Sequence, residues 1–264
     1  MFKSKVGYEW GKLMKNAKLI SFLLFIMLLA GWEAIAKTMS ELVLPAPSVI
    51  FMTLYEGMLD GYFLPHIIRT LSEVLLGLIL GSLFGFIVGI LMGELTFLRK
   101  LLFPYVIASQ AVPKLALAPL FILWFGFGMT SKVVITALIC FFPLLENTVT
   151  AIQFTDRQKI ELFRVLDATR FQTLIRLKIP AGLPSIMAGF RVAVVMAVVG
   201  AVVGEFIGGS EGLGAMIIAS QGMMDTPLMF AILTLLTVIG MGLYQLVLLI
   251  EKKLLKRYTK EKLL

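Results

Sequence analysis

The sequence predicts an all-α membrane protein with six transmembrane helices. Its composition, its unbroken apolar runs and the placement of its basic residues support this prediction. Of the 264 residues, 59% are hydrophobic and 15% are charged, whereas soluble domains are roughly 45–50% apolar and about 25% charged. The apolar residues form long runs, while the strands of a transmembrane barrel would alternate over short segments. We therefore expect one helical membrane domain.

The net charge of +8 comes mainly from four clusters of basic residues. All four fall on one side of a membrane if the chain crosses it six times. Because cytoplasmic loops carry an excess of Lys and Arg, that side is predicted to be the cytoplasm, and both termini lie there. This placement favours membrane lipid over nucleic acid as the partner of the charge. The clusters lie in residues 3–18, 99–100, 157–178 and 252–262.

The basic segment at residues 1–18 is expected to lie on the membrane surface, partly as a helix. The first span is predicted from Leu19 to Ala36. A secretory signal peptide needs a small-residue cleavage site after its apolar core, and none follows here, so we expect a retained anchor. Glu33, near the outer end of this span, is expected to reach the interface.

Residues 37–69 form the longest predicted outside segment. Leu44 to Ser48 should be a turn or extended, because each of its prolines disfavours helix in the residue before it. Ser48 is then predicted to cap an amphipathic helix that ends at Asp60-Gly61. His66, the single histidine, opens the next helix, and a structural role is favoured over a ligand role.

The second span, Leu71 to Gly93, has a glycine at every fourth position of one helix face. In lipid, helices associate largely by close packing, and small residues let two backbones approach. This face therefore predicts a tight helix contact. An internal helix is favoured over a second subunit as the partner, although the pattern itself allows both. The glycines are Gly77, Gly81, Gly85, Gly89 and Gly93.

The third span, Leu101 to Phe127, is predicted to be irregular because Pro104, Pro113 and Pro119 interrupt it. Gln110 and Lys114 lie mid-way along it. A charge at that depth costs about 2.5–3.5 kcal/mol unless it faces water or a partner, so this span is predicted to line a translocation pathway. The alternative is that Lys114 extends to an interface.

The fourth and fifth spans are predicted at Lys132 to Val149 and Pro184 to Gly204. Small residues again line one face of the fifth span. Arg191 lies within this span and Glu205 near its outer end, too far apart to pair along one helix at about 1.5 Å per residue. Buried polar groups in membranes are usually functional, so both are predicted to belong to the pathway.

Phe206 to Thr226 is predicted as an outside connection with a short helix over Ala215 to Gln221. A glycine-rich phosphate loop is the rival interpretation, but no strand precedes these glycines and no lysine ends them. Pro227 to Ile250 is the sixth span, and residues 251–264 form a basic tail expected on the anionic inner surface.

The polar stretch at residues 157–184, here called the coupling stretch, lies between the fourth and fifth spans. Asp167 and Thr169 are residue types that start helices, and Pro180 is predicted to stop the helix that follows them. An ordinary cytoplasmic loop is the alternative interpretation. Helical spacing predicts an apolar face made of Phe171, Leu174 and Ile175.

The coupling stretch resembles the signature of permease subunits of binding-protein-dependent ABC importers, in which Glu-Ala-Ala, Gly and Ile-x-Leu-Pro stand at fixed spacing. Leu162 and Phe163 replace the two alanines, and an aspartate that tolerates the left-handed conformation replaces the glycine. The matching positions are Glu161, Asp167, Leu177, Ile179 and Pro180.

Other pieces resemble the nitrate, sulfonate and taurine branch of that family. They are Leu115 to Gly128, Glu205 to Gly208 and Gly212 to Gly214, and the resemblance covers roughly residues 40–250. It implies the type I ABC importer permease fold over residues 19–250, in the bacterial inner membrane. The family branch also takes in pyrimidine vitamin precursors and riboflavin, so the substrate stays open.

The resemblance also implies partners. Two permease copies, as a homodimer or as two related chains, would enclose the pathway, and an outside solute-binding protein would deliver the solute. Separate ATPase subunits would bind ATP and Mg, and this chain would bind no cofactor and catalyse no reaction. The residues that the resemblance assigns to the ATPase contact are Glu161, Asp167, Ala168, Thr169, Arg170, Phe171, Leu177, Ile179 and Pro180.

The residues alone leave two other classes of protein to weigh. A secondary transporter or channel would need no ATPase, but we find no convincing inverted repeat between the two halves. A membrane enzyme would need a clustered catalytic set, whereas the chain has one Cys, one His and scattered acids. No metal site is predicted from so few ligands, and no nucleotide-binding motif is present.

Overall fold

The computed structural model describes the backbone of residues 2–261 and the side chains of residues 19–255. Every regular element within these residues is helical, as predicted. The element η1 is a 3-10 helix and η2 is a π-helix. In chain order the elements are α1 (Phe2–Ala36), α2 (Pro47–Leu59), α3 (Leu64–Glu94), α4 (Thr96–Ala111), η1 (Lys114–Leu117), α5 (Ala118–Phe125), α6 (Met129–Gln153), α7 (Arg157–Val165), α8 (Arg170–Thr173), η2 (Leu174–Lys178), α9 (Ile179–Gly208), α10 (Leu213–Gly222) and α11 (Thr226–Glu261).

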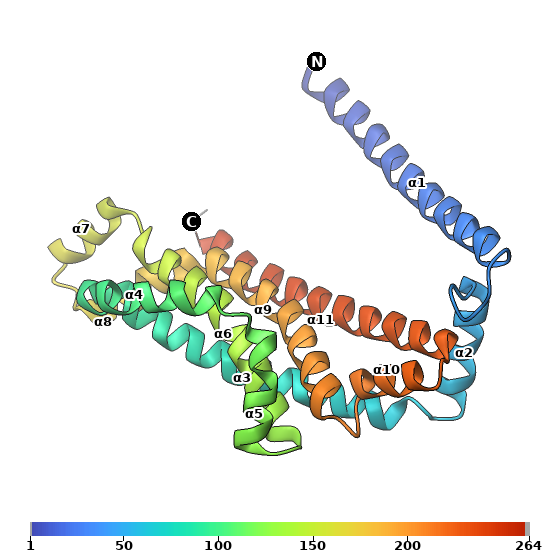
Figure 1. Cartoon of the computed structure of the whole chain (residues 1–264). Helices are drawn as coiled ribbons and strands as arrows, with labels where there is room; N and C mark the ends of the chain where they lie inside the picture. The colour runs from blue at the N-terminus through green and yellow to red at the C-terminus, as the bar shows by residue number, and fades with distance from the viewer. Residues whose placement is uncertain (1, 262–264) are drawn as a thin grey trace.

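Five of the described helices are long and apolar enough to cross a membrane, and the bent pair of α4 with η1–α5 makes a sixth when it is counted as one span. The long helices α3, α6 and α9 form the centre, with α6 packed against both of the others. The α7–α8 end of the molecule lies opposite α10 (Figure 1). The number of spans therefore agrees with the prediction.

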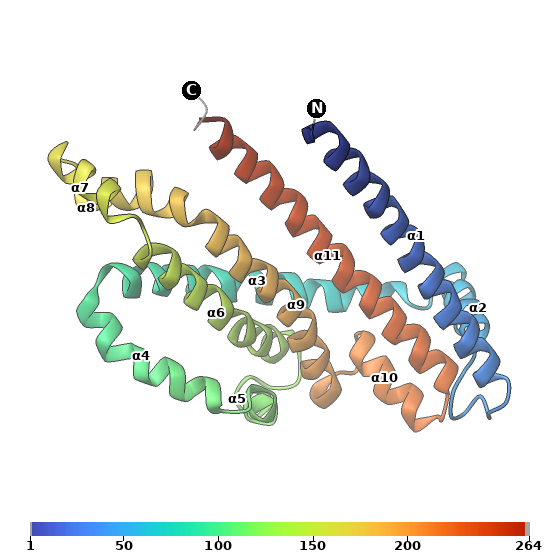
Figure 2. The same cartoon turned by 90° about the horizontal axis from the view of Figure 1, so that it is seen from above.

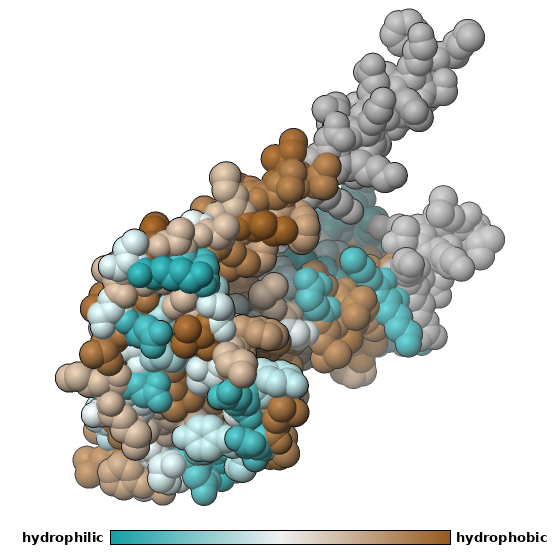
Figure 3. All heavy atoms as spheres, turned by 90° about the vertical axis from the view of Figure 1, so that its right-hand side faces the viewer, coloured by the Kyte–Doolittle hydropathy of each residue, from teal (hydrophilic) through white to brown (hydrophobic). Residues whose placement is uncertain are grey.

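Helix α1 projects away from the central helices (Figure 1). Its apolar side chains are exposed from Leu19 to Leu28, which suits a helix surrounded by lipid. The prediction that residues 1–18 lie on the membrane surface falls on side chains outside the described residues. Most side chains of the basic tail also lie outside the described residues. The face seen from the α2 and α10 side carries intermixed polar and apolar residues (Figure 3).

The five-glycine face of α3 lies against α6, so its partner is an internal helix. A Cβ added at Gly81 would come within 2.9 Å of the Ala137 Cα, and one at Gly93 within 2.9 Å of the Ile152 side chain. On the other side of α6, a Cβ at Gly189 would meet Asn147 in the same way. The backbones of α3 and α9 therefore both lie close to α6, because small residues let helices approach each other in lipid.

Replacing Gly81 by alanine is expected to destabilise the protein by about 1–3 kcal/mol or more, because the new methyl group would overlap the α6 backbone. Gly31 on α1 is the matched control, since nothing lies within 4 Å of a Cβ added there. Thermal unfolding of the two variants in lipid nanodiscs measures the difference. Equal unfolding temperatures for Gly81→Ala and Gly31→Ala would contradict the tight packing.

The prediction that Pro180 stops a helix is wrong, and the helix that carries the fifth span begins before Pro184. The π-helix η2 runs directly into α9, and both prolines lie within helical backbone. The N–H of Ile179 donates to the Leu174 carbonyl, five residues back. A proline ring normally clashes with the carbonyl four residues before it. The wider π turn accommodates the ring, so the helix continues.

The third span is broken, as predicted, but Pro104 does not break it. Pro104 lies inside α4, and the break falls at Val112-Pro113, where the two segments meet at an angle of 85°. Pro119 stands in the first turn of α5, where a missing N–H costs nothing because it would have no helical partner. One proline of the three therefore sets the bend.

Ser48 does not cap the outer helix, contrary to the prediction. The helix begins at Pro47, after Ala46, because a proline suits the first helical position with its fixed φ. Ser48 instead donates its backbone N–H and its hydroxyl to the Glu33 carboxylate, at 3.1 and 2.8 Å. These bonds tie the end of α1 to the start of α2. The predicted end at Asp60-Gly61 is confirmed.

Candidate functional site

The coupling stretch forms two short helices with a sharp break between them. Asp156 caps α7 by accepting from the Gln158 N–H at 2.9 Å. Thr169 caps α8 in a reciprocal box, in which its hydroxyl accepts from the Gln172 N–H at 3.2 Å and the Gln172 side chain accepts from the Thr169 N–H at 2.9 Å. Asp167 adopts the left-handed conformation with φ of 50°, as its place at the signature glycine predicts.

The outward surface of the coupling stretch combines apolar and basic side chains. Phe171 and Ile175 of the predicted apolar face are exposed, while Leu174 is half-buried. Several large apolar side chains exposed on a polar element are typical of a surface that contacts another protein or a membrane. The exposed apolar side chains are Leu162, Val165, Leu166, Phe171 and Ile175. The exposed basic side chains are Arg157, Lys159, Arg164, Arg170 and Arg176.

The second half of the signature anchors this surface to the membrane helices. Leu177 is buried, and Ile179 and Pro180 are half-buried at the start of α9. The Lys178 ammonium pairs with the Glu94 carboxylate at the end of α3, at 2.6 Å. Both side chains of this pair are mostly buried, so it fixes η2 against α3. Neither Lys178 nor Glu94 was predicted as a site residue.

Gln110 and Lys114 line one cavity of about 400 Å³ where the third span breaks. The Gln110 amide donates to the Glu146 carboxylate, and the Lys114 ammonium lies 4.1 Å from the centre of the Phe142 ring. We call this space the pathway cavity. Its remaining lining comes from α6, α9 and η1 and consists of Leu115, Ile139, Pro143, Asn147, Val192, Met196 and Val199.

A second cavity of about 580 Å³, the inner cavity, lies between α4 and the end of α6. Arg99 and Lys100 line it, as does Phe154, which directly follows α6. Glu146 lines both cavities, so the two adjoin. Together they lead from the break in the third span toward the coupling stretch.

Arg191 and Glu205 lie apart from the pathway cavity, so the four predicted pathway residues do not form one group. Arg191 pairs with Glu251 of α11 at 3.1 Å. Glu205 is fully buried and accepts from the Thr70 hydroxyl and the Gly214 N–H, both at 2.6 Å. The expectation that the two do not pair with each other along α9 therefore agrees with the structure.

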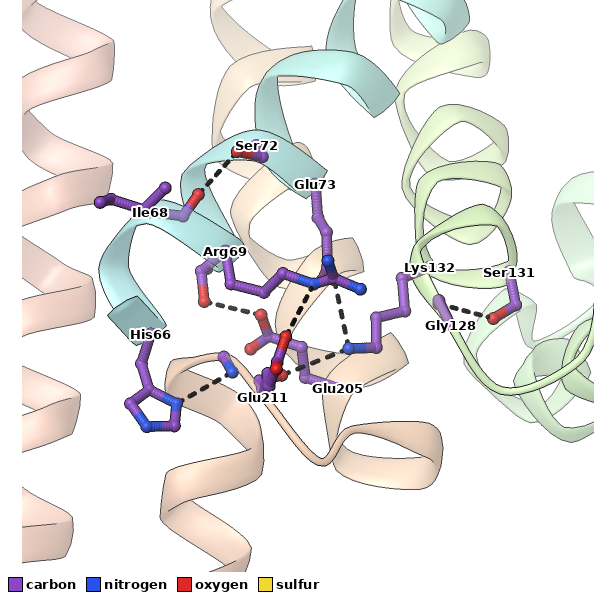
Figure 4. A network of polar contacts seen from close by, with 12 residues as sticks. His66, Ile68, Arg69, Ser72, Glu73, Gly128, Ser131, Lys132, Glu205 and Glu211 are labelled. Atoms are coloured by element: carbon purple, nitrogen blue, oxygen red, sulfur yellow. Dashed lines mark hydrogen bonds and ion pairs between the residues drawn. The ribbon is translucent and has the colours of Figure 1, made fainter. Parts of the chain in front are cut away.

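Glu205 belongs to a buried set of polar residues that we call the outer network, drawn in Figure 4. It joins the start of α3 to the glycine turn before α10. The Leu213 N–H donates to the Thr70 hydroxyl at 2.8 Å, and the Gly212 N–H donates to His66 Nδ1 at 3.1 Å. Gly212 has φ of +111°, and a Cβ there would overlap the Glu205 carboxylate. His66 therefore has a structural contact, as favoured.

The charged half of the outer network centres on Glu73, which is fully buried. Its Oε1 lies 3.0 Å from the Arg69 guanidinium and 3.2 Å from the Lys132 ammonium. Lys132 is only 2% exposed and also donates to the Glu211 carbonyl at 3.3 Å. This group of charged residues was not predicted from the sequence. It could have been predicted from the spans, because Glu73, Lys132 and Glu205 all lie near the predicted outer ends of their spans and hence at a similar depth in the membrane.

Comparison with known proteins decides the family. Residues 74–257 match the family described as "Binding-protein-dependent transport system inner membrane component". The chain belongs to this family. The match covers the broken span, the stretch at residues 157–184, α9, α10 and most of α11 of this permease.

Named relatives place the permease in the predicted branch. It is 39% identical to the riboflavin transport system permease protein RibX of Chloroflexus aurantiacus, over 96% of this chain and 93% of that protein. It is 37% identical to the formylaminopyrimidine transport permease protein ThiX of Halalkalibacterium halodurans, with 83% and 87% covered. It is 36% identical to the putative aliphatic sulfonates transport permease protein SsuC of Bacillus subtilis, with 89% and 86% covered.

Solved structures confirm the fold. A chain of the MetNI methionine ABC transporter in inward-facing conformations matches with a TM-score of 0.62 at 19% identity, over 70% of this permease and 93% of that chain. A chain of an amino acid ABC transporter crystallised with histidines gives 0.61 at 20% identity, with 76% and 97% covered. The permease therefore has the type I ABC importer fold and is a multi-pass inner-membrane protein that serves solute import.

In the part of the chain that the structure describes, no group of three or more His, Cys, Asp or Glu side chains is placed to hold a metal ion. Glu73 instead meets the basic side chains of Arg69 and Lys132, and Glu205 accepts from the Thr70 hydroxyl and the Gly214 N–H.

Proposed function

We propose that the coupling stretch docks on a separate ATPase subunit, which binds ATP and Mg and performs the hydrolysis, while the permease binds no cofactor. The observation that carries this proposal is the exposed apolar surface around Phe171 on an otherwise polar, basic element. Buried aromatic and apolar anchors supply most of the binding energy of protein interfaces. The Lys178–Glu94 pair would then transmit movement of the docked helices to α3 and α9.

The solute pathway in this proposal runs through the pathway cavity and the inner cavity, with Gln110 and Lys114 facing the solute. A second copy of the permease completes the enclosure as a homodimer, and an outside solute-binding protein delivers the solute. Helix α9 lines the cavity, and two of its residues hold it in place in this proposal. Arg191 does so through its ion pair with Glu251, and Glu205 through its hydrogen bond with Thr70. ATP binding would switch the pathway from inward-facing to outward-facing.

The orientation is also part of the proposal, with both termini and the coupling stretch in the cytoplasm. The ends of α1 and α11 and the α7–α8 pair all lie away from α10 (Figure 2), which supports it. Basic residues on that side would contact anionic lipid headgroups. The solute is a small molecule of the kinds named for the relatives, namely riboflavin, formylaminopyrimidine or an aliphatic sulfonate.

The test is a pull-down of the tagged full chain from mildly solubilised native membranes, with its partners identified by mass spectrometry. We expect an ATPase subunit in an amount about equal to that of the permease. Recovery of no ATPase, together with solute transport by the purified chain alone in vesicles, would support a secondary transporter or channel and contradict the proposal.

A further inference from the structure

The carboxyl of Glu205 in the outer network is buried without a basic partner. Its Oε1 accepts from the Thr70 hydroxyl and its Oε2 from the Gly214 N–H, and both of these donors are neutral. No ion pair within the described residues involves Glu205. An ionised carboxylate is costly to bury without a counter-charge, and such a group normally takes up a proton instead.

The basic side chains of the outer network contact the neighbouring carboxyl of Glu73. Arg69 and Lys132 both lie against Glu73 Oε1, at 3.0 and 3.2 Å. A hydrogen-bond contact also joins the side chains of Glu73 and Glu205. Glu205 therefore has another carboxyl beside it and no positive charge in contact with it.

One oxygen of Glu73 has no donor. Its Oε2 is buried, and no hydrogen-bond donor among the described residues reaches it. Two ionised carboxylates cannot hydrogen-bond to each other, because neither carries a proton to donate. A single proton held between Glu73 and Glu205 would supply the missing donor and remove the repulsion between two like charges.

The other titratable groups that face the pair do not neutralise it. His66 on α3 accepts the Gly212 N–H at its Nδ1, so that nitrogen carries no proton. Glu211, in the turn before α10, adds a negative charge 3.8 Å from the Arg69 guanidinium. Its side chain is 65% exposed, so the network reaches the surface there, and a proton can exchange with water. Figure 4 shows these groups around the pair.

The pair also holds the glycine turn before α10. The N–H groups of three consecutive residues, 212–214, donate to the side chains of His66, Thr70 and Glu205. Thr70 donates its own hydroxyl proton to Glu205. Movement of the Glu205 carboxyl away from Glu73 would therefore disturb two of these three attachments.

We propose that Glu73 and Glu205 share one proton, and that this proton acts as a latch that holds the glycine turn and α10 against α3. Loss of the proton to water leaves two carboxylates in contact, which repel each other and loosen the turn. The latch is a property of the outer network alone, so it stands or falls independently of the proposed contact with an ATPase subunit.

Infrared spectroscopy tests the proton directly, because a protonated carboxyl absorbs apart from an ionised carboxylate. The full chain is measured at neutral pH in a detergent that has no ester groups. We expect a carboxylic acid band in the parent protein and its loss in Glu205→Gln. Absence of the band from the parent protein, or an unchanged band in Glu205→Gln, would overturn the inference.

Hydrogen exchange tests the latch. In Glu73→Gln the amide oxygen can still accept from Arg69 and Lys132, while the amide nitrogen supplies a permanent donor to Glu205. At about pH 9, amides 212–214 of the parent protein in nanodiscs should exchange at least about tenfold faster than those of Glu73→Gln. At about pH 6 the two proteins should exchange alike, because the parent protein then keeps its proton.

Glu56→Gln, at an exposed carboxylate on α2, is the matched control and should exchange like the parent protein at both pH values. Comparison at one pH removes the ordinary acceleration of exchange by base. Equal exchange of amides 212–214 in the parent protein and Glu73→Gln at both pH values, with the unfolding temperature preserved, would overturn the latch. If Glu73→Gln does not fold, the infrared spectrum of the parent protein still decides whether the proton is present.

Discussion

Replacing Phe171 by aspartate is expected to abolish recovery of the ATPase subunit with the permease. Phe171 is 69% exposed on α8 and stands beside exposed Ile175, so it is the aromatic anchor of the proposed docking surface. Truncating such an anchor costs about 2 kcal/mol or more, and a buried unpaired carboxylate adds to that cost. Association should therefore fall at least about 30-fold. Co-purification from native membranes measures it.

The matched control is Phe127→Asp, because Phe127 is also a phenylalanine with high exposure, 80%, but lies before α6, away from the coupling stretch. This variant should retain the ATPase. Phe127 ends the third span, where an aspartate carries a cost if it faces lipid, so ATPase recovery is compared only after the unfolding temperature of each variant has been measured in nanodiscs. Full ATPase recovery with Phe171→Asp, or equal losses with the two variants, would show that α8 does not make the contact.

Replacing Lys132 by methionine is expected to destabilise the protein by about 3 kcal/mol. The change leaves the buried Glu73 carboxylate with Arg69 alone, and removing one partner of a buried ion pair costs about 3–5 kcal/mol. Arg69 compensates in part, so the lower end applies. The unfolding temperature in nanodiscs should fall by about 6–12 °C. Lys37→Met, at a surface pair, should change it little.

A double variant distinguishes the ion pair from ordinary packing. Glu73→Gln together with Lys132→Met removes both charges, and buried pairs replaced as a unit are often neutral in stability. The double variant should therefore be more stable than the sum of the two single losses predicts. Simple additivity would mean that Glu73 and Lys132 are not coupled, and the outer network would then have no part in holding α6 against α3.

The features that depend on neighbouring residues were predictable from the sequence. Thr169 and Gln172 make a capping box within four residues, and Asp167 takes a positive φ at the place of the signature glycine. Pro180 was not predictable in the same way, because its effect depends on the π turn that precedes it. The rule that proline ends helices assumes a regular α turn, and η2 does not provide one.

The site residues that come from distant parts of the chain were harder to predict. Gln110 and Lys114 are close in sequence and share a cavity, but their partners Glu146 and Phe142 come from α6. Glu205 was expected in the pathway because it is buried and charged, whereas its partner Thr70 is on α3. Hydropathy gives the depth of a residue in the membrane but not the direction in which it faces, and that direction decides its role.

Site-specific cross-linking from Phe171→Cys tests whether α8 contacts the ATPase subunit. The native Cys140 is fully buried and directs its thiol to the Ala193 carbonyl, so a photoreactive maleimide should label mainly the introduced cysteine. After illumination in native membranes, we expect a cross-link between residue 171 and the ATPase subunit, and none from Phe127→Cys. An ATPase that co-purifies with the permease but cross-links only from position 127, or from neither position, would show that α8 is not the docking element.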